Sequence, residues 1–369
     1  MPEPIQRHET RRIYIGPVPI GGGAPITVQS MTNTPTGDVS ATVDQIKRLT
    51  AAGCEIIRVA VPDEQAAAAI KAIKAQIDIP LVADIHFDHR LALAAARHGA
   101  DGLRINPGNI GGGDKVQAVA DCATDLGLPI RIGVNAGSLE KDLLHTYHGA
   151  TAQAMVESAL RHVTLLEAAG FEQIKISIKA SDIQRTVAAY SLLAQRTDYP
   201  LHVGITEAGS LYSGIVKSAL GIGMLLHQGI GDTLRVSLTR DPVEEVRVGY
   251  EILKALEIRR HGPEIISCPT CGRCGIDLIA IVEEVDKLLL NRSVPIKLAI
   301  MGCVVNGPGE AKEADIGIAG GKDLGILFKK GKVEKKVPQD KLIEVLMAEV
   351  EAWEKEYNKG IKGQEQEKH

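Results

Sequence analysis

A regular alternation of two kinds of segment between residues 25 and 257 limits the possible folds more than any other feature of the chain. Short runs rich in β-branched residues alternate with alanine-rich stretches whose apolar residues recur at helical spacing. This alternation is typical of parallel strands joined by crossover helices. We predict eight strands, at residues 26–31, 55–61, 81–86, 102–106, 130–135, 173–179, 201–207 and 233–238.

Eight strand–helix units in a segment of this length predict an α/β fold, a (β/α)8 barrel of the TIM type, which usually takes about 250 residues. Helices are expected between the strands, for example at residues 39–52, 64–76, 90–98 and 151–169, with Ala, Leu and Ile on one face. A doubly wound open sheet is the alternative. We favour the barrel because every predicted strand ends in polar or charged residues, whereas an open sheet would gather them at one switch point.

The predicted strand ends are rich in basic residues. In a barrel the carboxyl ends of the strands converge on one face, where the active sites of this fold lie. Guanidinium groups bind phosphate through two parallel hydrogen bonds, so the inferred ligand is a small di- or polyphosphate. Each arginine could instead pair with a neighbouring carboxylate in a network around the rim. The basic residues expected at the mouth are Arg58, Arg104, Arg131, Lys179 and Arg235, with Asp84 and Glu207 as the acids.

Two further side chains at the strand ends are candidates for proton transfer. His86 follows Asp84 and could act as an acid or a base near neutral pH, although a hydrogen-bonded core histidine is the alternative. Glu207 lies in a Gly-Ile-Thr-Glu-Ala-Gly segment at the end of the seventh predicted strand. It is the carboxylate best placed to donate a proton to a ligand in the mouth.

Length and composition exclude several classes of protein. The 369 residues exceed the usual size of one domain, so a large domain and a small one are expected. A formal charge of -4 argues against nucleic acid as the main partner. The amino terminus lacks the apolar core of a signal peptide and no run of eighteen apolar residues occurs, so we expect a cytoplasmic protein that does not bind membranes.

Four of the six cysteines lie within one stretch near the carboxyl end. Cys268, Cys271 and Cys274 follow a C-x2-C-x2-C spacing, and Cys303 comes from a distant predicted turn. This arrangement indicates a metal site, either an iron–sulfur cluster or a structural zinc site with four thiolates. The turn after Cys303 contains Gly-Pro-Gly and ends at Glu310. A carboxylate is a more exchangeable ligand of iron than a thiolate, which favours a cluster with one iron open to a substrate.

The cysteines belong to a predicted second domain. The barrel is assigned to residues 1–258, a small α+β iron–sulfur domain to residues 265–358, and a disordered tail to residues 359–369. The second domain is expected to contain helices at about 277–290 and 339–356 and strands at 296–300, 315–321 and 325–328. Residues 329–336 are predicted to form a basic hairpin turn.

Several long motifs in a fixed order resemble one enzyme family over nearly the whole chain, from about residue 12 to residue 321. They are Val-Ala-Asp-Ile-His-Phe-Asp at 82–88, Leu-Arg-Ile-Asn-Pro-Gly-Asn at 103–109, Gly-Ile-Thr-Glu-Ala-Gly at 204–209, Cys-Pro-Thr-Cys at 268–271 and Gly-Cys-Val-Val-Asn-Gly-Pro-Gly-Glu at 302–310. Together they resemble the bacterial 4-hydroxy-3-methylbut-2-en-1-yl diphosphate synthases, in the shorter two-domain form.

The resemblance implies a [4Fe-4S] cluster held by Cys268, Cys271, Cys303 and Glu310, which leaves Cys274 as a spare cysteine. It also implies a catalytic role for Glu207 and Glu310. The implied reaction is a two-electron reductive ring opening, with loss of water, of 2-C-methyl-D-erythritol 2,4-cyclodiphosphate in the non-mevalonate isoprenoid pathway. The residues that the resemblance and the strand ends together assign to the substrate are Arg58, Asp84, His86, Arg104, Arg131, Asn135, Lys179, Arg235 and Ser237.

The resemblance further implies a homodimer whose active site is shared between subunits, and reduced flavodoxin or ferredoxin as the electron donor. Because these carriers are acidic, the basic turn at 329–336 is a candidate docking patch. Two other functions compete. A radical S-adenosylmethionine enzyme would need a C-x3-C-x2-C run near the first barrel strand, which this chain lacks there. A zinc-ribbon interaction module on an inactive barrel would contain zinc and be colourless.

Overall fold

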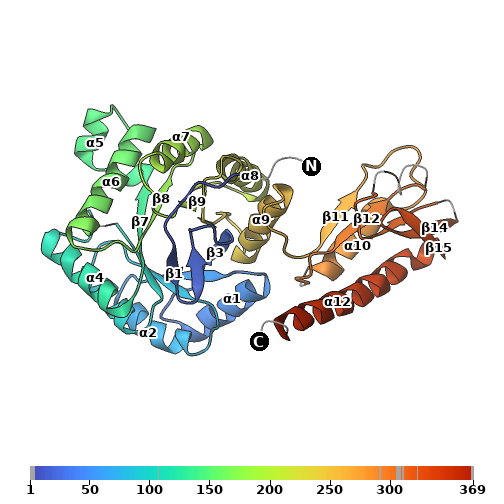
Figure 1. The fold of residues 1–369 in the computed structure, drawn as a ribbon, viewed down its shortest axis with the longest axis horizontal. Coiled ribbons are helices and arrows are strands. Elements are labelled where there is room, and N and C mark those ends of the chain that lie inside the picture. The colour runs from blue at the N-terminus through green and yellow to red at the C-terminus, as the bar shows by residue number, and fades with distance from the viewer. Residues whose placement is uncertain are drawn as a thin grey trace. The chain divides into compact units, whose positions relative to one another are not determined.

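The computed structural model describes residues 5–106, 108–290, 292–304, 309, 311–321 and 323–366. The chain divides into two compact units, Met1–Arg259 and Arg260–His369. Each unit has its own sheet and its own core (Figure 1). Glu310 lies outside the described residues, as do Pro107, Asn291, Lys322 and residues 305–308.

The first unit is a barrel of eight parallel strands in the order β8-β7-β6-β5-β4-β3-β10-β9. A parallel bridge between Ile176 and Leu201 joins β8 to the start of β9 and closes the ring. All eight predicted strands are present, so the predicted fold class is confirmed. Their bounds are β3 Thr27–Met31, β4 Ile56–Ala60, β5 Leu81–Asp84, β6 Gly102–Ile105, β7 Ile130–Asn135, β8 Ile174–Lys179, β9 His202–Val203 and β10 Thr233–Leu234.

Helices surround these strands (Figure 1). Their bounds are α1 Val39–Ala51, α2 Glu64–Lys74, α3 His89–Arg97, α4 Gly113–Leu126, α5 Lys141–Thr146, α6 Ala152–Ala168, α7 Ile183–Ala194, α8 Leu211–His227 and α9 Pro242–Ala255, with a 3-10 turn at Ala136–Ser138. Five of them begin after an aspartate whose side chain accepts a backbone N–H of the first turn. These caps fix where the chain turns from each strand into the next helix.

A short antiparallel hairpin that the sequence did not predict precedes the barrel. It consists of β1, Ile13–Ile15, and β2, Val18–Ile20. Three isoleucines of the hairpin pack against Ile56 and Val82, which lie near the amino ends of β4 and β5. The hairpin therefore closes the end of the barrel opposite the carboxyl ends of the strands.

The second unit is a five-stranded sheet with two long helices. Strands β11, β12 and β13 are parallel, and β13, β14 and β15 are antiparallel. Helices α10 and α12 pack on one face, where Val285 and Leu346 join the core residues Leu298 and Ile318. The bounds are β11 Glu264–Ser267, α10 Leu278–Leu289, β12 Lys297–Met301, β13 Ile316–Ala319, β14 Leu324–Lys329, β15 Lys332–Pro338, a 3-10 turn at Gln339–Lys341 and α12 Leu342–Gln366.

The carboxyl-terminal elements differ in part from the sequence prediction. Strands β14 and β15 form the expected basic hairpin, but Lys329 and Lys335 both pair with Glu349 of α12. Helical backbone continues to Gln366, past the predicted end at residue 356. Lys, Glu and Gln have high helix propensity and favour this extension, whereas Gly360 and Gly363 each oppose it by about 1 kcal/mol relative to alanine. No helix in the described part of the chain is long and apolar enough to cross a membrane.

Candidate functional site

Basic side chains fill the interior of the barrel. Alternate residues of a strand point to the same side of a sheet, so a basic residue at every second position of a barrel strand can face inward. Strand β8 shows this pattern, with Lys175, Ser177 and Lys179 all buried. Six basic residues contribute to the interior: Arg58, Arg104, Arg131, Lys175, Lys179 and Arg235.

Asp84 pairs with two of these six residues. Its carboxylate lies 3.3 Å from Nε of Arg58 and 3.0 Å from Nη1 of Arg104. Burial would raise the pKa of Asp84, but the charges of Arg58 and Arg104 outweigh burial and hold that pKa at about 2. Asp84 is therefore ionised and orients two guanidinium groups. For Arg58 and Arg104, the structure thus shows the pairing with a neighbouring carboxylate that was the alternative to free phosphate-binding groups.

Arg235 is paired with a residue that sequence reasoning missed. Its guanidinium lies 3.3 Å from the carboxylate of Glu245, in the first turn of α9. The position of Glu245 in the helix that follows β10 is the only sequence signal for this contact. Arg58 also donates to the Sδ atom of Met31, at 2.9 Å from Nη2. A thioether is a weak acceptor, so this guanidinium keeps capacity for a stronger one.

Arg131 and Lys179 complete the basic site without a carboxylate partner among the described residues. Burial and the charges of neighbouring basic groups lower the pKa of both side chains well below their usual values. Gly204 makes room for Lys179, because a Cβ atom there would lie 2.8 Å from Nζ. The interior therefore contains more positive than negative charge, an arrangement that favours a bound anion.

The remaining predicted substrate residues lie at the carboxyl ends of the strands. His86 is exposed after β5, with Nδ1 3.2 Å from Nη1 of Arg104. It is thus not the core histidine of the alternative interpretation. Asn135 ends β7 and Ser237 follows β10, and both are half-buried. These positions bring the predicted residues to one end of the barrel.

Glu207 lies in the turn between β9 and α8. Its side chain is exposed, and its backbone has a φ of 52°, a conformation that few residues other than glycine adopt. The amide of Thr206 donates to the carbonyl of Ala180, next to Lys179 at the end of β8. This turn places the Glu207 backbone beside the basic end of β8, although no described contact joins the two side chains.

The cysteine segments come together in the second unit. Gly302 donates its N–H to Sγ of Cys268 at 3.3 Å, and its carbonyl accepts the N–H of Gly275 at 2.9 Å. Cys303 therefore follows a residue that touches the loop at 268–275. Cys271 is exposed, whereas Cys274 packs against the core and lies 3.3 Å from the carbonyl of Ile276.

These contacts fit a thiolate-held metal group. Two chain segments that carry cysteines meet through the backbone of Gly302, and an N–H donor to a cysteine sulfur is a common way to stabilise a thiolate ligand. Among the described residues, no group of three His, Cys, Asp or Glu side chains lies close enough together to hold a metal ion. The fourth predicted ligand, Glu310, is outside the described residues.

The fold and the barrel site define a (β/α)8-barrel protein with a buried basic site, followed by a smaller cysteine-bearing domain. A family model described as the GcpE TIM-barrel domain matches residues 10–250, and one described as the GcpE protein C-terminal domain matches residues 264–352. The chain belongs to the GcpE family.

Relatives of similar length support this assignment. A 4-hydroxy-3-methylbut-2-en-1-yl diphosphate synthase (flavodoxin) of Geobacter sulfurreducens is 62% identical over 343 residues, 93% of this chain and 97% of that protein. The protein of the same name from Desulfotalea psychrophila is 59% identical over 96% of this chain and 98% of its own. The one from Caldanaerobacter subterraneus is 60% identical over 95% of this chain and 99% of its own. Among solved structures, a dihydropteroate synthase of Stenotrophomonas maltophilia matches 67% of this chain and 98% of its own at 15% identity, with a TM-score of 0.49.

Proposed function

We propose that this protein is a 4-hydroxy-3-methylbut-2-en-1-yl diphosphate synthase that reduces and opens 2-C-methyl-D-erythritol 2,4-cyclodiphosphate. The observation that carries the proposal is the buried excess of positive charge in the barrel. Arg131 and Lys179 have no carboxylate partner among the described residues. A cyclic diphosphate supplies the missing negative charge, and relatives that match nearly the full chain have this enzyme name.

The basic side chains bind the diphosphate and stabilise it as it becomes the leaving group. The bond between C2 of the substrate and its phosphate oxygen breaks, which opens the ring. The hydroxyl on C3 leaves as water, and a double bond forms between C2 and C3. Two electrons and one proton enter. Negative charge grows on the diphosphate as the bond breaks, so guanidinium groups already oriented by Asp84 stabilise the transition state more than the ground state.

Glu207 donates the proton that the leaving hydroxyl needs. Its side chain is exposed at the carboxyl end of β9, beside the basic end of β8. His86 and Arg104 assist by holding one end of the substrate, and Asn135 and Ser237 contribute neutral hydrogen bonds at the mouth.

The second unit is proposed to hold a [4Fe-4S] cluster on Cys268, Cys271, Cys303 and Glu310. When bound, this group would supply the two electrons one at a time and act as a Lewis acid. The chain's own part is to gather the thiolates, with the N–H of Gly302 stabilising the Cys268 sulfur. Cys274 is proposed as a spare cysteine, although both it and the proposed ligand Cys268 pack against the core of this unit.

We further propose a cytoplasmic homodimer in which the cluster domain of one subunit completes the barrel site of the other. Residues 1–258 serve as the substrate domain, residues 265–358 as the cluster domain, and residues 359–369 as a carboxyl-terminal tail. Reduced flavodoxin or ferredoxin is the proposed electron donor, and flavodoxin agrees with the names of the relatives.

The proposal is tested by anaerobic purification, with iron and sulfide counted and EPR spectra recorded. The wild type should contain about four irons per chain. Cys274→Ser should keep the cluster and its spectrum, and Glu310→Ala should keep the cluster with an altered spectrum and no turnover. Loss of the cluster in Cys274→Ser would show that this cysteine is a ligand. Zinc in place of iron would favour the structural zinc module instead.

A further inference from the structure

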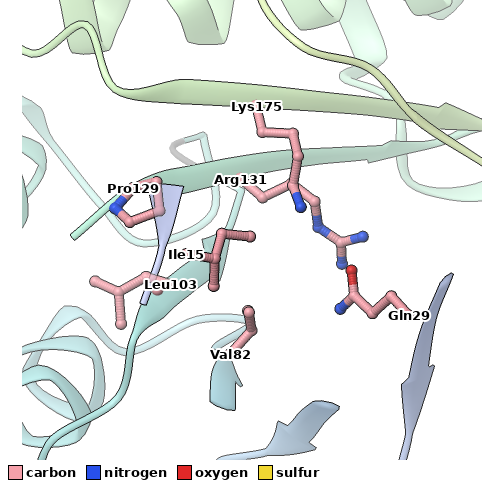
Figure 2. Close-up of a pocket in the computed structure, with 8 residues that line it drawn as sticks. Ile15, Gln29, Val82, Leu103, Pro129, Arg131 and Lys175 are labelled. Atoms are coloured by element: carbon pink, nitrogen blue, oxygen red, sulfur yellow. The ribbon is translucent and has the colours of Figure 1, made fainter. Parts of the chain in front are cut away.

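A small cavity lies near the amino ends of the barrel strands, deeper than the proposed substrate site (Figure 2). One wall is apolar and is formed by Ile15 of the hairpin together with Val82 and Leu103. The other wall is polar and is formed by Gln29, Arg131 and Lys175. Figure 2 shows the guanidinium of Arg131 and the amide of Gln29 pointing toward one another, with Lys175 extending into the same region.

The polar wall consists of buried groups without hydrogen-bond partners. Gln29, Arg131 and Lys175 are only 2%, 3% and 2% exposed. Both amide atoms of Gln29, Nε and Nη1 of Arg131 and Nζ of Lys175 have no partner. A buried donor without a partner is costly, and more so when it is charged, so several together on one cavity indicate an occupant.

The charge of the cavity identifies the kind of occupant. Arg131 and Lys175 are both basic, and neither forms an ion pair with a described carboxylate. Burial and the charge of Arg131 lower the pKa of Lys175 well below its usual value. A water molecule would satisfy some donors but leave the cationic forms of both side chains disfavoured by burial, whereas an anion would stabilise those forms.

The size of the cavity limits the anion to a small one. The space open to water-sized spheres measures about 10 Å³, about what one water molecule occupies. A phosphate group is too large for this space, whereas a single halide ion needs only slightly more room than a water molecule. We propose that this cavity is a buried halide site, in which Lys175, Arg131 and the amide of Gln29 bind one chloride ion.

The halide position would differ from the substrate position, but Arg131 would contact both ligands. Lys175 and Lys179 are both on β8, with Lys175 nearer the amino end. A halide at the deep position would hold Lys175 and Arg131 charged when no substrate is bound. It would therefore stabilise the barrel whether or not the proposed reaction takes place.

Crystallography of the full chain tests the location of the ion. Crystals of the wild type grown with inorganic pyrophosphate, which should occupy the substrate site, are soaked in sodium bromide, and anomalous difference maps are calculated. We expect a bromide peak in contact with Nζ of Lys175 and the amide of Gln29. A map with only a water molecule at that position, or with no peak, would overturn the proposal.

Thermal unfolding tests the same site in solution. At constant ionic strength, replacing gluconate by chloride should raise the midpoint of the wild type by about 3–5 °C at roughly tenfold excess over the dissociation constant. Lys175→Met keeps a side chain of similar shape without the charge, and it should lose this chloride-specific shift. Lys71→Met, an exposed change on α2, is the matched control and should keep it. An equal shift in Lys175→Met and the wild type would contradict the proposal.

Discussion

Asp84 accepts a 3.0 Å hydrogen bond from Nη1 of Arg104, and both side chains are more than nine-tenths buried. The other carboxylate oxygen lies 3.3 Å from Nε of Arg58. One acid thus holds two guanidinium groups in fixed positions before any ligand binds. Orientation of donors in advance lowers the cost of binding and strengthens their effect on developing charge.

Replacement of Asp84 by asparagine should destabilise the barrel. The change leaves two buried guanidinium groups uncompensated, a situation that typically costs about 3–5 kcal/mol. Urea denaturation at neutral pH measures the loss, and added pyrophosphate should restore part of it. Because the folded pKa is about 2 and the unfolded pKa about 3.9, the contribution of Asp84 is present above about pH 4 and is lost as the pH falls toward 2. An unchanged denaturation midpoint in Asp84→Asn would refute this account.

Lys179→Met should weaken diphosphate binding. The variant removes one charged donor, and a charged hydrogen bond contributes about 1.5–3 kcal/mol, so the dissociation constant should rise by about 10- to 100-fold. Titration calorimetry with inorganic pyrophosphate measures the effect. Lys47→Met, an exposed change on α1, is the control and should bind as the wild type does. Equal affinities in Lys179→Met and the control would exclude Lys179 from the site.

His202 should make the stability of the barrel depend on pH. It is fully buried, with Nδ1 2.7 Å from Oγ1 of Thr233, and burial followed by the charge of Lys179 lowers its pKa well below the usual value. The unfolded state therefore binds a proton below about pH 6.5 that the folded state does not. Stability should be complete above that pH and fall by up to about 1.4 kcal/mol per pH unit below it. His202→Gln should reduce this slope, and denaturation curves recorded from about pH 7 to 5 measure it; an identical slope would disprove the assignment.

Gly302→Ala should disrupt the cysteine loop. A Cβ atom at this position would lie 2.6 Å from Sγ of Cys274, so the Cys274 side chain must shift within the loop at 268–275. We expect a lower iron content after anaerobic reconstitution. Adding Cys274→Ala removes the atom in conflict and should restore much of the iron. If the double variant binds as little iron as Gly302→Ala alone, the contact with Cys274 is not the cause.

Neutralising the exposed lysines of the β14–β15 hairpin should slow electron delivery by an acidic carrier. Glu349 already compensates two lysines of this hairpin, and the exposed remainder is Lys330, Lys332 and Lys336. Their combined change to glutamine should reduce flavodoxin-driven turnover and its sensitivity to salt, and leave dithionite-driven turnover unchanged. Lys341→Gln with Lys355→Gln is the control on the same unit. Equal effects on both reductants would argue against a docking role.

The barrel strands could be predicted because their signal is local. Runs such as Ile-Arg-Ile-Gly-Val-Asn in β7 combine β-branched residues with a basic residue at an inward position. The hairpin of β1 and β2 was missed because each strand has only three residues and β2 contains a proline. Its stability comes from packing on Ile56 and Val82, which are distant in the sequence.

The position of the basic residues in the barrel could be predicted, but their pairing could not. Strand ends identified Arg58, Arg104 and Lys179, because all parallel strands end on one side of the barrel. Which arginine has a carboxylate partner depends on side-chain directions across several strands, and the contact of Arg235 with Glu245 leaves no pattern in the sequence. The depth of Lys175 likewise follows from the stagger of the strands and the position of the hairpin.

The hairpin packs across the amino end of the barrel, so the basic interior is reached from the carboxyl ends of the strands. A product that leaves from that same end has to depart before the next substrate molecule can enter. A linear diphosphate product keeps the charged group that the basic side chains would bind. Under the proposed function, product would therefore compete directly with substrate, and the rate of its departure would set an upper limit on turnover.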